Sequence, residues 1–514
     1  MARGWPAVAA LLWACSGQGP EPQPATCDDV TWEGFAQPTI TNWCLPCHAS
    51  TVVGESRRGA PEGLDFDGYA RAQAAADLIA GAVDGEDAPM PPGGGMRPAE
   101  RDGLVRWADC GAPGPATPTP PDACSVRVDY PGDASGDTDV CGGGANALTG
   151  TLTLGGAPGP GLACLCEVDG DVVVQGATGT LSLPGLWRIG GALQVDQAQL
   201  ESLALPELLE AGSVVFTDVQ AAAVDLDRLT TVTGAVTLQR GSLPSVFEPL
   251  RLQSVGGVFA LVAVGGVATL DLPRLESVGG DMVFQDLPAL RRVLHTSDLT
   301  SVGGSLRFVG NPVLQEVEDF GFLVNVYGDV EIGGGGSLRQ IDALFDLSRV
   351  SGDFVIRDEP NLVGIEGFGA LRVVGGGLRV LRTGSLGIDA FDGLEELGEL
   401  EIGSNSQLAT WIWRAPSAIP GSVRITEVPA LTALSLGGLG EVGGDFTVAA
   451  DTALVDLGAP ALETVGGTVS LEQNAALQSL GGLGALGSVG GDLVVRGNGA
   501  LTQAEIDAWL AGWA

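Results

Sequence analysis

The chain has 514 residues and a formal net charge of −38, because 63 acidic residues stand against 25 basic ones, all of them Arg. This length exceeds a single compact core and predicts several domains or one long repetitive array. Such a negative surface repels phosphate, which excludes nucleic acid as a partner. Anionic lipid is an unfavourable partner for the same reason. With only two His, a metal centre of several imidazoles is excluded. No apolar run reaches the roughly 18 residues of a membrane helix.

A short export signal is expected at the beginning of the chain. A basic residue precedes an apolar run over residues 8–13, and Leu12-Trp13-Ala14-Cys15 resembles the bacterial lipoprotein cleavage box, in which Cys becomes the acylated first residue. We expect residues 1–14 to be a signal peptide and the polar, Pro-rich residues 15–26 to be a surface tether. Trp13 is bulky for this box, so ordinary signal-peptidase cleavage stays open. Either route predicts the periplasm, outer membrane or cell surface of a Gram-negative bacterium, with membrane attachment only through a lipid anchor.

Nine Cys are present, and setting aside Cys15 and the two in the motif described next leaves six. An even number in an exported chain is typical of disulfides. We expect Cys27 to pair with Cys110, because the two bracket one compact segment. A bridge between Cys164 and Cys166 would be strained, so cross-links from these two to the remaining pair are favoured, without a choice between them. The six candidates are Cys27, Cys110, Cys124, Cys141, Cys164 and Cys166.

The motif Cys44-Leu45-Pro46-Cys47-His48 carries the clearest chemistry of the chain. C-x-x-C-H is the attachment motif for c-type haem: two thiols three residues apart reach the two vinyl groups of one macrocycle, and the His that follows lies under the iron. The alternatives are a thioredoxin-like dithiol, which needs a βαβ context, and half of a zinc site, which needs two further Cys or His nearby. The segment provides neither, so the sequence predicts one covalent haem c.

Met90 is the candidate for the ligand on the opposite side of the iron. It stands between prolines in a stretch that cannot form a helix, and such a loop can present the thioether to an open metal face. Met96 is the weaker candidate, because a helix begins directly after it at Pro98. A second helical pattern covers residues 67–83, so we expect two or three helices around the haem.

Residues 27–115 resemble the short single-haem cytochrome c domains of planctomycete and myxobacterial proteins. The likeness is carried by Cys44–His48, by Gly63-Leu64-Asp65, by Met90-Pro91-Pro92-Gly93-Gly94 and by Leu104-Val105-Arg106-Trp107. This resemblance implies haem binding and electron transfer. It implies thioether anchors at Cys44 and Cys47, a proximal ligand at His48 and a distal ligand at Met90.

One motif, Val-Gly-Gly-x-Leu-x-Val, recurs between residues 170 and 497, after a Pro-rich linker at 116–123 and a Cys-containing cap at 124–169. The residues two and four positions after the second Gly are apolar in every copy, and the residue between them is mixed. This alternation predicts a strand with two inward side chains around an outward one. The aligned Gly fall at positions 170, 191, 212, 234, 257, 280, 304, 328, 352, 376, 398, 421, 444, 467 and 491.

Strands that recur about every 23 residues predict a solenoid, in which each turn buries its apolar residues against its neighbours. Frequent Pro and Gly between the strands argue against a helix-backed horseshoe. The predicted fold class is therefore a small all-α cytochrome c domain followed by an all-β, parallel, right-handed β-solenoid of about fifteen turns. The repeats resemble the receptor L domain and its leucine-rich-repeat relatives, a likeness that implies protein or glycan binding on the sheet face. The Asn slot of that frame holds Asn311, Asn405, Asn474 and Asn498.

Residues 498–514 are expected to close the last turn. Thr502-Gln-Ala-Glu505 is a capping box, and Ile506, Trp509, Leu510 and Trp513 follow at helical spacing. Such a helix would cover the end of the core and block end-to-end stacking.

The sequence as a whole favours an exported, lipid-anchored electron carrier positioned by a binding solenoid. The alternative is a surface recognition or adhesion protein in which the haem is sensory or secondary. An enzyme is not expected, because a di-haem peroxidase needs two C-x-x-C-H motifs and the glycine runs precede strands, with no Lys after them, unlike a phosphate-binding loop. The redox partner is not specified by the sequence. Candidate contacts for a protein or glycan on the sheet face are Arg307, Arg357, Arg379, Arg424 and Arg496.

Overall fold

The computed structural model describes residues 27, 30–48, 57, 59–61, 63–66, 69–84, 90, 96, 98–113 and 120–511, except 297, 318, 319, 342, 389 and 415. The expected signal peptide (1–14), the tether (15–26), Cys15 and Trp513 lie outside these residues. Within them, no helix is long and apolar enough to cross a membrane.

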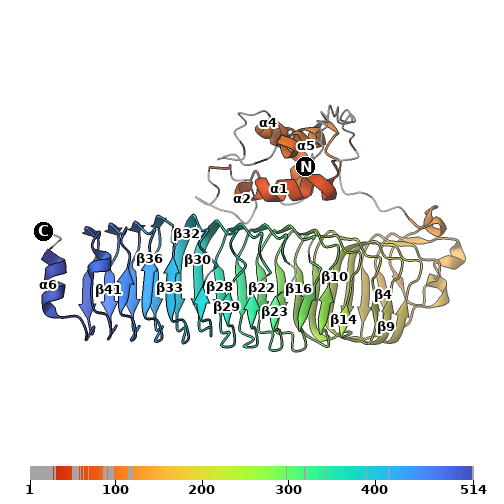
Figure 1. Ribbon diagram of the computed structural model, residues 1–514. Coiled ribbons are helices and arrows are strands. Elements are labelled where there is room, and N and C mark those ends of the chain that lie inside the picture. The colour runs from red at the N-terminus through yellow and green to blue at the C-terminus, as the bar shows by residue number, and fades with distance from the viewer. Residues whose placement is uncertain are drawn as a thin grey trace, which may run out of the picture.

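Most of the chain forms one parallel β-solenoid of about fifteen turns, as the repeat predicts (Figure 1). Every turn contributes strands that pair only with the same position of the turns before and after it. The strands fall into three rows along the solenoid, and all pairings within a row are parallel.

The main row holds the strand of the repeat motif. Its members are β2 (Ala134–Ser135), β4 (Leu152–Leu154), β6 (Val172–Gln175), β8 (Arg188–Asp196), β10 (Glu210–Ala221), β13 (Val236–Ser242), β16 (Phe259–Gly265), β19 (Met282–Gln285), β22 (Leu306–Val309), β25 (Val330–Gly333), β28 (Phe354–Arg357), β30 (Val373–Leu381), β32 (Glu396–Gly403), β35 (Val423–Thr426), β38 (Phe446–Ala449), β41 (Val469–Glu472) and β43 (Leu493–Arg496).

Two rows of shorter strands complete each turn. The row before the repeat glycines comprises β1 (Asp129–Tyr130), β3 (Ala147–Leu148), β5 (Glu167–Val168), β12 (Thr231–Val232), β15 (Ser254–Val255), β18 (Ser277–Val278), β21 (Ser301–Val302), β24 (Asn325–Val326), β27 (Arg349–Val350), β34 (Ala418–Ile419), β37 (Glu441–Val442), β40 (Thr464–Val465) and β42 (Ser488–Val489). The third row comprises β7 (Thr178–Ser182), β9 (Gln199–Ala204), β11 (Val224–Asp225), β14 (Val246–Phe247), β17 (Thr269–Asp271), β20 (Arg292–Leu294), β23 (Glu316–Val317), β26 (Gln340–Ile341), β29 (Gly364–Ile365), β31 (Gly387–Ile388), β33 (Thr410–Trp413), β36 (Ala433–Leu436) and β39 (Asp456–Gly458).

The core of the solenoid is a column of apolar side chains from all three rows. In most main strands the two inward positions are buried and the residue between them is at least partly exposed, as the alternation predicts. The exceptions are β43, whose inward residues are only partly buried, and β16 and β19, in which Ala260 and Val283 between the inward positions are buried too. Large rings stack from turn to turn: the ring centres of Phe284 and Phe308 are 4.9 Å apart. Because each turn buries its apolar face only against its neighbours, stability accumulates along the column. Among the described residues from 125 to 502, short 3-10 turns occur but no α-helix, which agrees with the expected absence of a helical backing.

In the fifteen turns with an aligned Gly, the main strand meets a residue with left-handed backbone, which directly follows the strand in most turns and lies inside it in β10, β13 and β16. The repeat motif does not predict this feature. The sixth residue after the aligned Gly has φ between 50° and 74° in all fifteen turns, and only four of these residues are Gly. Here the chain leaves the main row sharply. A residue with a Cβ is strained in this conformation, by about 1 kcal/mol, so the corner stores strain in most turns. The corner residues are Gly176, Gln197, Asp218, Arg240, Ala263, Asp286, Gly310, Gly334, Asp358, Arg382, Ser404, Glu427, Ala450, Gln473 and Gly497.

The residue after this corner points into the core and forms a polar ladder in the second half of the solenoid. Asn474 shows the pattern: its Oδ1 accepts a hydrogen bond from the backbone N–H of Asp451 (3.0 Å), and its Nδ2 donates to the carbonyl oxygen of Val448 (2.8 Å). The other three Asn of the predicted slot bind backbone in the same way. These amides satisfy backbone groups that the corner leaves unpaired.

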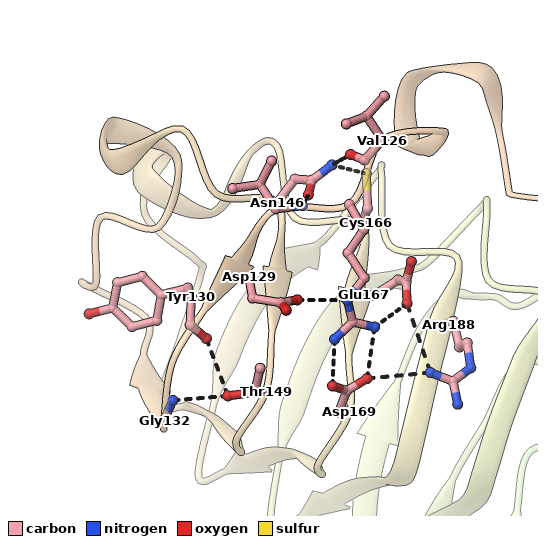
Figure 2. Close-up of polar contacts among 12 residues, drawn as sticks. Val126, Asp129, Tyr130, Gly132, Asn146, Thr149, Cys166, Glu167, Asp169 and Arg188 are labelled. Carbon is pink, nitrogen blue, oxygen red and sulfur yellow. Dashed lines mark hydrogen bonds and ion pairs between the residues drawn. The ribbon is translucent and has the colours of Figure 1, made fainter.

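The N-terminal end of the solenoid is held by two disulfides and an arginine network. Cys124 pairs with Cys166 and Cys141 with Cys164, and β1–β5 already belong to the parallel ladder ahead of the repeat. The Arg127 guanidinium lies 2.7 Å from Glu167 and 2.5 Å from Asp169. Figure 2 shows how Glu167, Asp169 and Arg188 converge in this network. The hydrogen bonds from Arg127 lower the pKa of Asp169, so the network favours the ionised carboxylate.

The C-terminal end is closed by α6 (Gln503–Ala511). The expected capping box is present: the Thr502 backbone N–H donates to the Glu505 carboxylate (2.8 Å), and the Glu505 N–H donates to Thr502 Oγ1 (3.3 Å). Ile506 and Trp509 pack against the end of the solenoid core. Leu510, which was also expected to cover the last turn, is 40% exposed, and the inward residues of β43 are only partly buried.

Helices from the first part of the chain pack over one edge of the solenoid, above its middle turns (Figure 1). A disulfide joins Cys27 to Cys110, the pair expected from the sequence. The stretch 67–83, expected as one helix, is divided into two at Ala75. The elements are η2 (Trp32–Ala36), α1 (Gln37–Trp43), α2 (Leu45–His48), α3 (Tyr69–Ala74), α4 (Ala76–Val83) and α5 (Pro98–Asp109). The solenoid part of the predicted fold class is therefore confirmed, whereas the structure does not by itself show a cytochrome domain.

Candidate functional site

The helical segment encloses an apolar cavity of about 130 Å³ beside the C-x-x-C-H motif. The turn between α1 and α2 contributes the Cys44 thiol, and α2 contributes the Cys47 thiol and the imidazole. α4 contributes aliphatic side chains, and the residues after α4 contribute two thioethers. The cavity is lined by Trp43, Cys44, Cys47, His48, Pro61, Leu64, Phe66, Leu78, Ile79, Ala82, Val83, Met90 and Met96. The structure therefore brings together every residue that the sequence proposes for one cofactor.

His48 is held in place through one of its ring nitrogens. Its Nδ1 lies 2.8 Å from the carbonyl oxygen of Leu64, which makes Nδ1 the donor and leaves the Nε2 lone pair available. The ring stacks on Phe66 with centres 4.5 Å apart, and the Phe66 N–H donates to the His48 carbonyl oxygen (2.8 Å). A backbone acceptor on Nδ1 is the usual way to orient a ligating imidazole.

Arg57 fixes the loop that presents the Leu64 carbonyl. It is buried, and its guanidinium pairs with Asp65 (3.0 Å) while donating to the carbonyl oxygens of Ala60, Pro61 and Leu64. Sequence reasoning missed this residue. An arginine eight residues before an aspartate, with no motif around them, was the only available signal.

Cys44 and Cys47 are free thiols. Burial, with a smaller contribution from the neighbouring Cys47, raises the pKa of Cys44 to about 12. The thiol is therefore protonated at neutral pH, and the two sulfurs remain unoxidised in a chain whose other described cysteines are all paired. Two reduced thiols beside an imidazole are the chemical groups that covalent haem attachment requires.

Both methionines proposed as the distal ligand reach the cavity. The Met90 N–H donates to the Ala82 carbonyl oxygen (3.1 Å), which ties Met90 to the end of α4. Met96 is buried, and Arg101 Nε donates to its carbonyl oxygen (3.3 Å). The expected preference for Met90 thus has no counterpart in the geometry, which places both thioethers at the same cavity.

Tyr327 directly follows β24 in the solenoid, but its side chain belongs to the packed core of the helical segment. Burial, with a smaller contribution from Cys44, raises the pKa of its hydroxyl well above the ordinary value. No motif marked this residue, but the sequence held a signal: Val-Tyr-Gly stands here in place of Val-Gly-Gly.

The arginines proposed as ligand contacts on the sheet face are engaged within the solenoid. Arg307 lies 3.2 Å from Asp281 and 3.5 Å from Asp329, on the turns before and after its own. The other four bind carboxylates of adjacent turns in the same way. A ligand would have to displace these carboxylates. The contacts that these arginines make in the structure link adjacent turns of the solenoid.

A groove of about 550 Å³ lies instead on the third row, over β26, β29 and β31. Its lining includes Arg339, Glu366, Val363 and Leu386, and each of the last two is 57% exposed. Exposed aliphatic side chains in a concave surface are typical of a binding site.

Comparisons with known proteins do not assign the chain to a family: no family model matches it, and no curated protein sequence matches it. Among the residues that the structure describes, no group of three or more His, Cys, Asp or Glu could hold a metal ion. The resemblance to single-haem cytochrome c domains fused to a receptor L domain is therefore wrong as a family assignment. What stands is a parallel β-solenoid with three disulfides, which indicate an oxidising, extracellular or periplasmic location.

Proposed function

We propose that the helical segment binds one haem covalently and that the protein is an exported electron carrier. The observation that carries this proposal is the convergence of two free thiols, one oriented imidazole and two thioethers on a single apolar cavity. A covalently held haem needs only one His and one further axial ligand, so a cluster of three His or carboxylate ligands is not required.

The residues have separate roles in this proposal. Cys44 and Cys47 would hold the group through thioether bonds, His48 Nε2 would ligate one side of the iron, and Met90 or Met96 the other. Haem, when bound, accepts and releases a single electron. The apolar lining excludes water, which stabilises the less charged state of a buried redox group. The cavity is smaller than a haem, so it has to widen on binding.

The location and anchor belong to the same proposal. The three disulfides support an exported chain, and Cys15 is the residue proposed to carry the lipid. Mass spectrometry of the mature protein tests both modifications at once: acylation appears on a peptide that begins at Cys15, and haem on the peptide that contains Cys44 and Cys47.

The haem proposal is tested by exporting the full chain together with a haem-attachment machinery. The expected result is a coloured protein with one covalent haem, and a colourless one for the double variant Cys44→Ser/Cys47→Ser. Met90→Leu and Met96→Leu identify the distal ligand, because only the ligating residue changes the spectrum of the reduced protein. Met282→Leu, in the solenoid core, is the matched control. Unmodified thiols in the exported wild-type chain would refute the proposal.

The groove supports the alternative, a surface recognition protein whose haem is sensory or secondary. A redox titration of the loaded protein separates the two functions. A haem that cycles reversibly with small reductants and oxidants supports the electron carrier, and a haem that small reductants do not reach supports the alternative.

A further inference from the structure

The solenoid departs from its own repeat at the place where the helical segment lies. The residue before each aligned Gly is itself Gly in most turns, including Gly256, Gly279 and Gly303. Packing explains this preference, since a Cβ on Gly279 would lie 2.3 Å from the Gly256 carbonyl oxygen, and one on Gly303 would lie 2.2 Å from that of Gly279. In the next turn the same position holds Tyr327, the largest side chain of the row.

This part of the row is in contact with the helical segment. α1 lies against β21, and Gln37 Nε2 donates to Ser277 Oγ (3.1 Å). Ser277 in β18 and Ser301 in β21 are buried. Three successive turns thus carry Ser and Gly here, at 254 and 256, 277 and 279, and 301 and 303, and the fourth carries an aromatic residue.

The ring of Tyr327 is 7% exposed and packs in the cluster that includes Ile40 and Leu45, with Cys44 at its edge. These residues belong to α1, to α2 and to the turn between them. Eight of the fifteen aligned turns have Gly at this position, and none of the others has a side chain as large as that of Tyr327. The packing contacts of this side chain are with the segment that carries the C-x-x-C-H motif.

We propose that Tyr327 completes the haem pocket from the solenoid: it covers the Cys44 side of the cavity and holds the turn between α1 and α2 in position. The inference rests on the proposed function for its relevance to haem, but the contact itself can be measured without haem. Tyr327 is a positioning residue, since it acts through Cys44 and the two helices. In this arrangement the Cys44 edge of the site faces the solenoid, and a redox partner has to approach from another side.

The experiment measures how fast Cys44 is alkylated in the full chain exported without haem, in a Cys15→Ser/Cys47→Ser background. Tyr327→Gly restores the glycine of the repeat and is expected to speed alkylation roughly tenfold or more, because it opens the packed side of the thiol. Tyr327→Phe keeps the ring and is expected to leave the rate unchanged. Ser351→Gly, one turn further along the same row, is the matched control and is also expected to have no effect.

The solenoid has to stay folded for this comparison, which its circular dichroism and melting temperature verify. If Tyr327→Gly does not fold, Gln37→Ala and Ser277→Val replace it, because both weaken the contact without changing the glycine row. An unchanged alkylation rate in folded Tyr327→Gly overturns the inference. The haem-loaded protein supplies a second readout. Tyr327→Gly is expected to shift the reduction potential of the haem, and Tyr327→Phe is expected to leave it at the wild-type value.

The two proposals fail in different ways. A protected Cys44 in a chain that never acquires haem supports the contact and refutes the electron carrier. A coloured protein whose haem-free form leaves Cys44 open to alkylation refutes the role of Tyr327 and leaves the electron carrier standing.

Discussion

Asp451 is an unfavourably placed acid in the solenoid core. It occupies the ladder position that Asn474 and Asn498 hold in the following turns and is fully buried. Its Oδ1 accepts from the Val428 N–H (2.7 Å), but its Oδ2 has no hydrogen-bond partner. In the neighbouring turn the corresponding Asn474 Nδ2 donates to a carbonyl oxygen, so an Asp451 carboxylate turns an acceptor toward another acceptor. Burial raises the pKa of Asp451 to about 7.

This gives a prediction with a defined sign. Because the pKa in the folded protein lies above its ordinary value of 3.8, folding favours the protonated acid. The contribution of Asp451 is complete below about pH 4 and is lost as the pH rises through about 7. Asp451→Asn cannot ionise and supplies the missing donor. It is expected to raise the free energy of unfolding by roughly 2 kcal/mol at pH 8, and by little near pH 4.

Denaturant unfolding at several pH values makes the comparison. Asp456→Asn, at an exposed position of β39, is the matched control and should change stability by less than about 0.5 kcal/mol. A gain from Asp451→Asn that is the same at both pH values would contradict the assignment of a protonated acid.

The left-handed corner supports a second prediction at the scale of single residues. Ala450 has a φ of 62°, and Ala449 directly before it lies in the extended strand β38. Ala450→Gly is expected to stabilise the protein by about 0.5–1 kcal/mol, because it removes the clash of a Cβ in this conformation. Ala449→Gly should destabilise it by a similar amount, because Gly is penalised in a strand. Thermal unfolding measures both, and equal effects of the two substitutions would show that the corner is not strained.

Among the elements, the N-terminal strands are held by ion pairs in addition to two disulfides. Glu167 in β5 is buried and binds Arg127, which also holds Asp169 and Asp129. Arg127→Gln leaves these carboxylates close together with less positive charge. We expect amide hydrogen exchange in β1–β5 to become several-fold faster, the equivalent of about 1 kcal/mol, with β38 and β41 unchanged because a solenoid couples only near neighbours.

The pH dependence of this effect has the opposite sign to that of Asp451. Arg127 lowers the pKa of Asp169, so its stabilisation is present above the ordinary pKa of 3.8 and is lost as the pH falls. The difference between wild type and Arg127→Gln should therefore vanish in acid. A difference that persists there would mean that packing of the Arg127 side chain, rather than charge, holds these strands.

At the scale of elements, the periodic features of the solenoid could be predicted from the sequence, and the features without a sequence period could not. Two inward residues per strand repeat in every turn, so the main row and its core could be predicted. The other two rows are mostly two-residue strands, too short for an alternating pattern to reveal. The corner could not be predicted either, because residues as different as Arg240 and Ala263 adopt it. Its conformation is imposed by the path of the chain and not by residue type.

The same distinction holds at the candidate site. Cys44, Cys47 and His48 are adjacent in the sequence, so a motif identifies them. Arg57 binds carbonyl oxygens and a carboxylate only three to eight residues away, but this arrangement matches no established motif. Tyr327 acts through contacts between distant segments, which no local pattern contains. Tyr327 could have been noticed only as an interruption of a repeat, and an interruption shows that something differs without showing what it contacts.

For the whole molecule, charge decides which partners can approach the proposed electron carrier. The formal net charge of −38 produces a negative potential around the site, and the sheet-face arginines cannot offset it because they are paired with carboxylates. Such a field attracts cationic reactants and repels anionic ones, and salt screens both effects over about 10 Å at 0.1 M ionic strength. A protein redox partner should therefore present a basic surface.

Stopped-flow oxidation of the haem-loaded protein tests this expectation. With a cationic small-molecule oxidant, the second-order rate constant should fall by about tenfold as the ionic strength rises from 0.01 to 0.5 M. With an anionic oxidant it should rise, and with an uncharged one it should stay nearly constant, which controls for effects of salt on the protein itself. Like trends for the cationic and anionic reagents would mean that the local surface around Cys47 and Met90, and not the charge of the whole chain, governs approach to the haem.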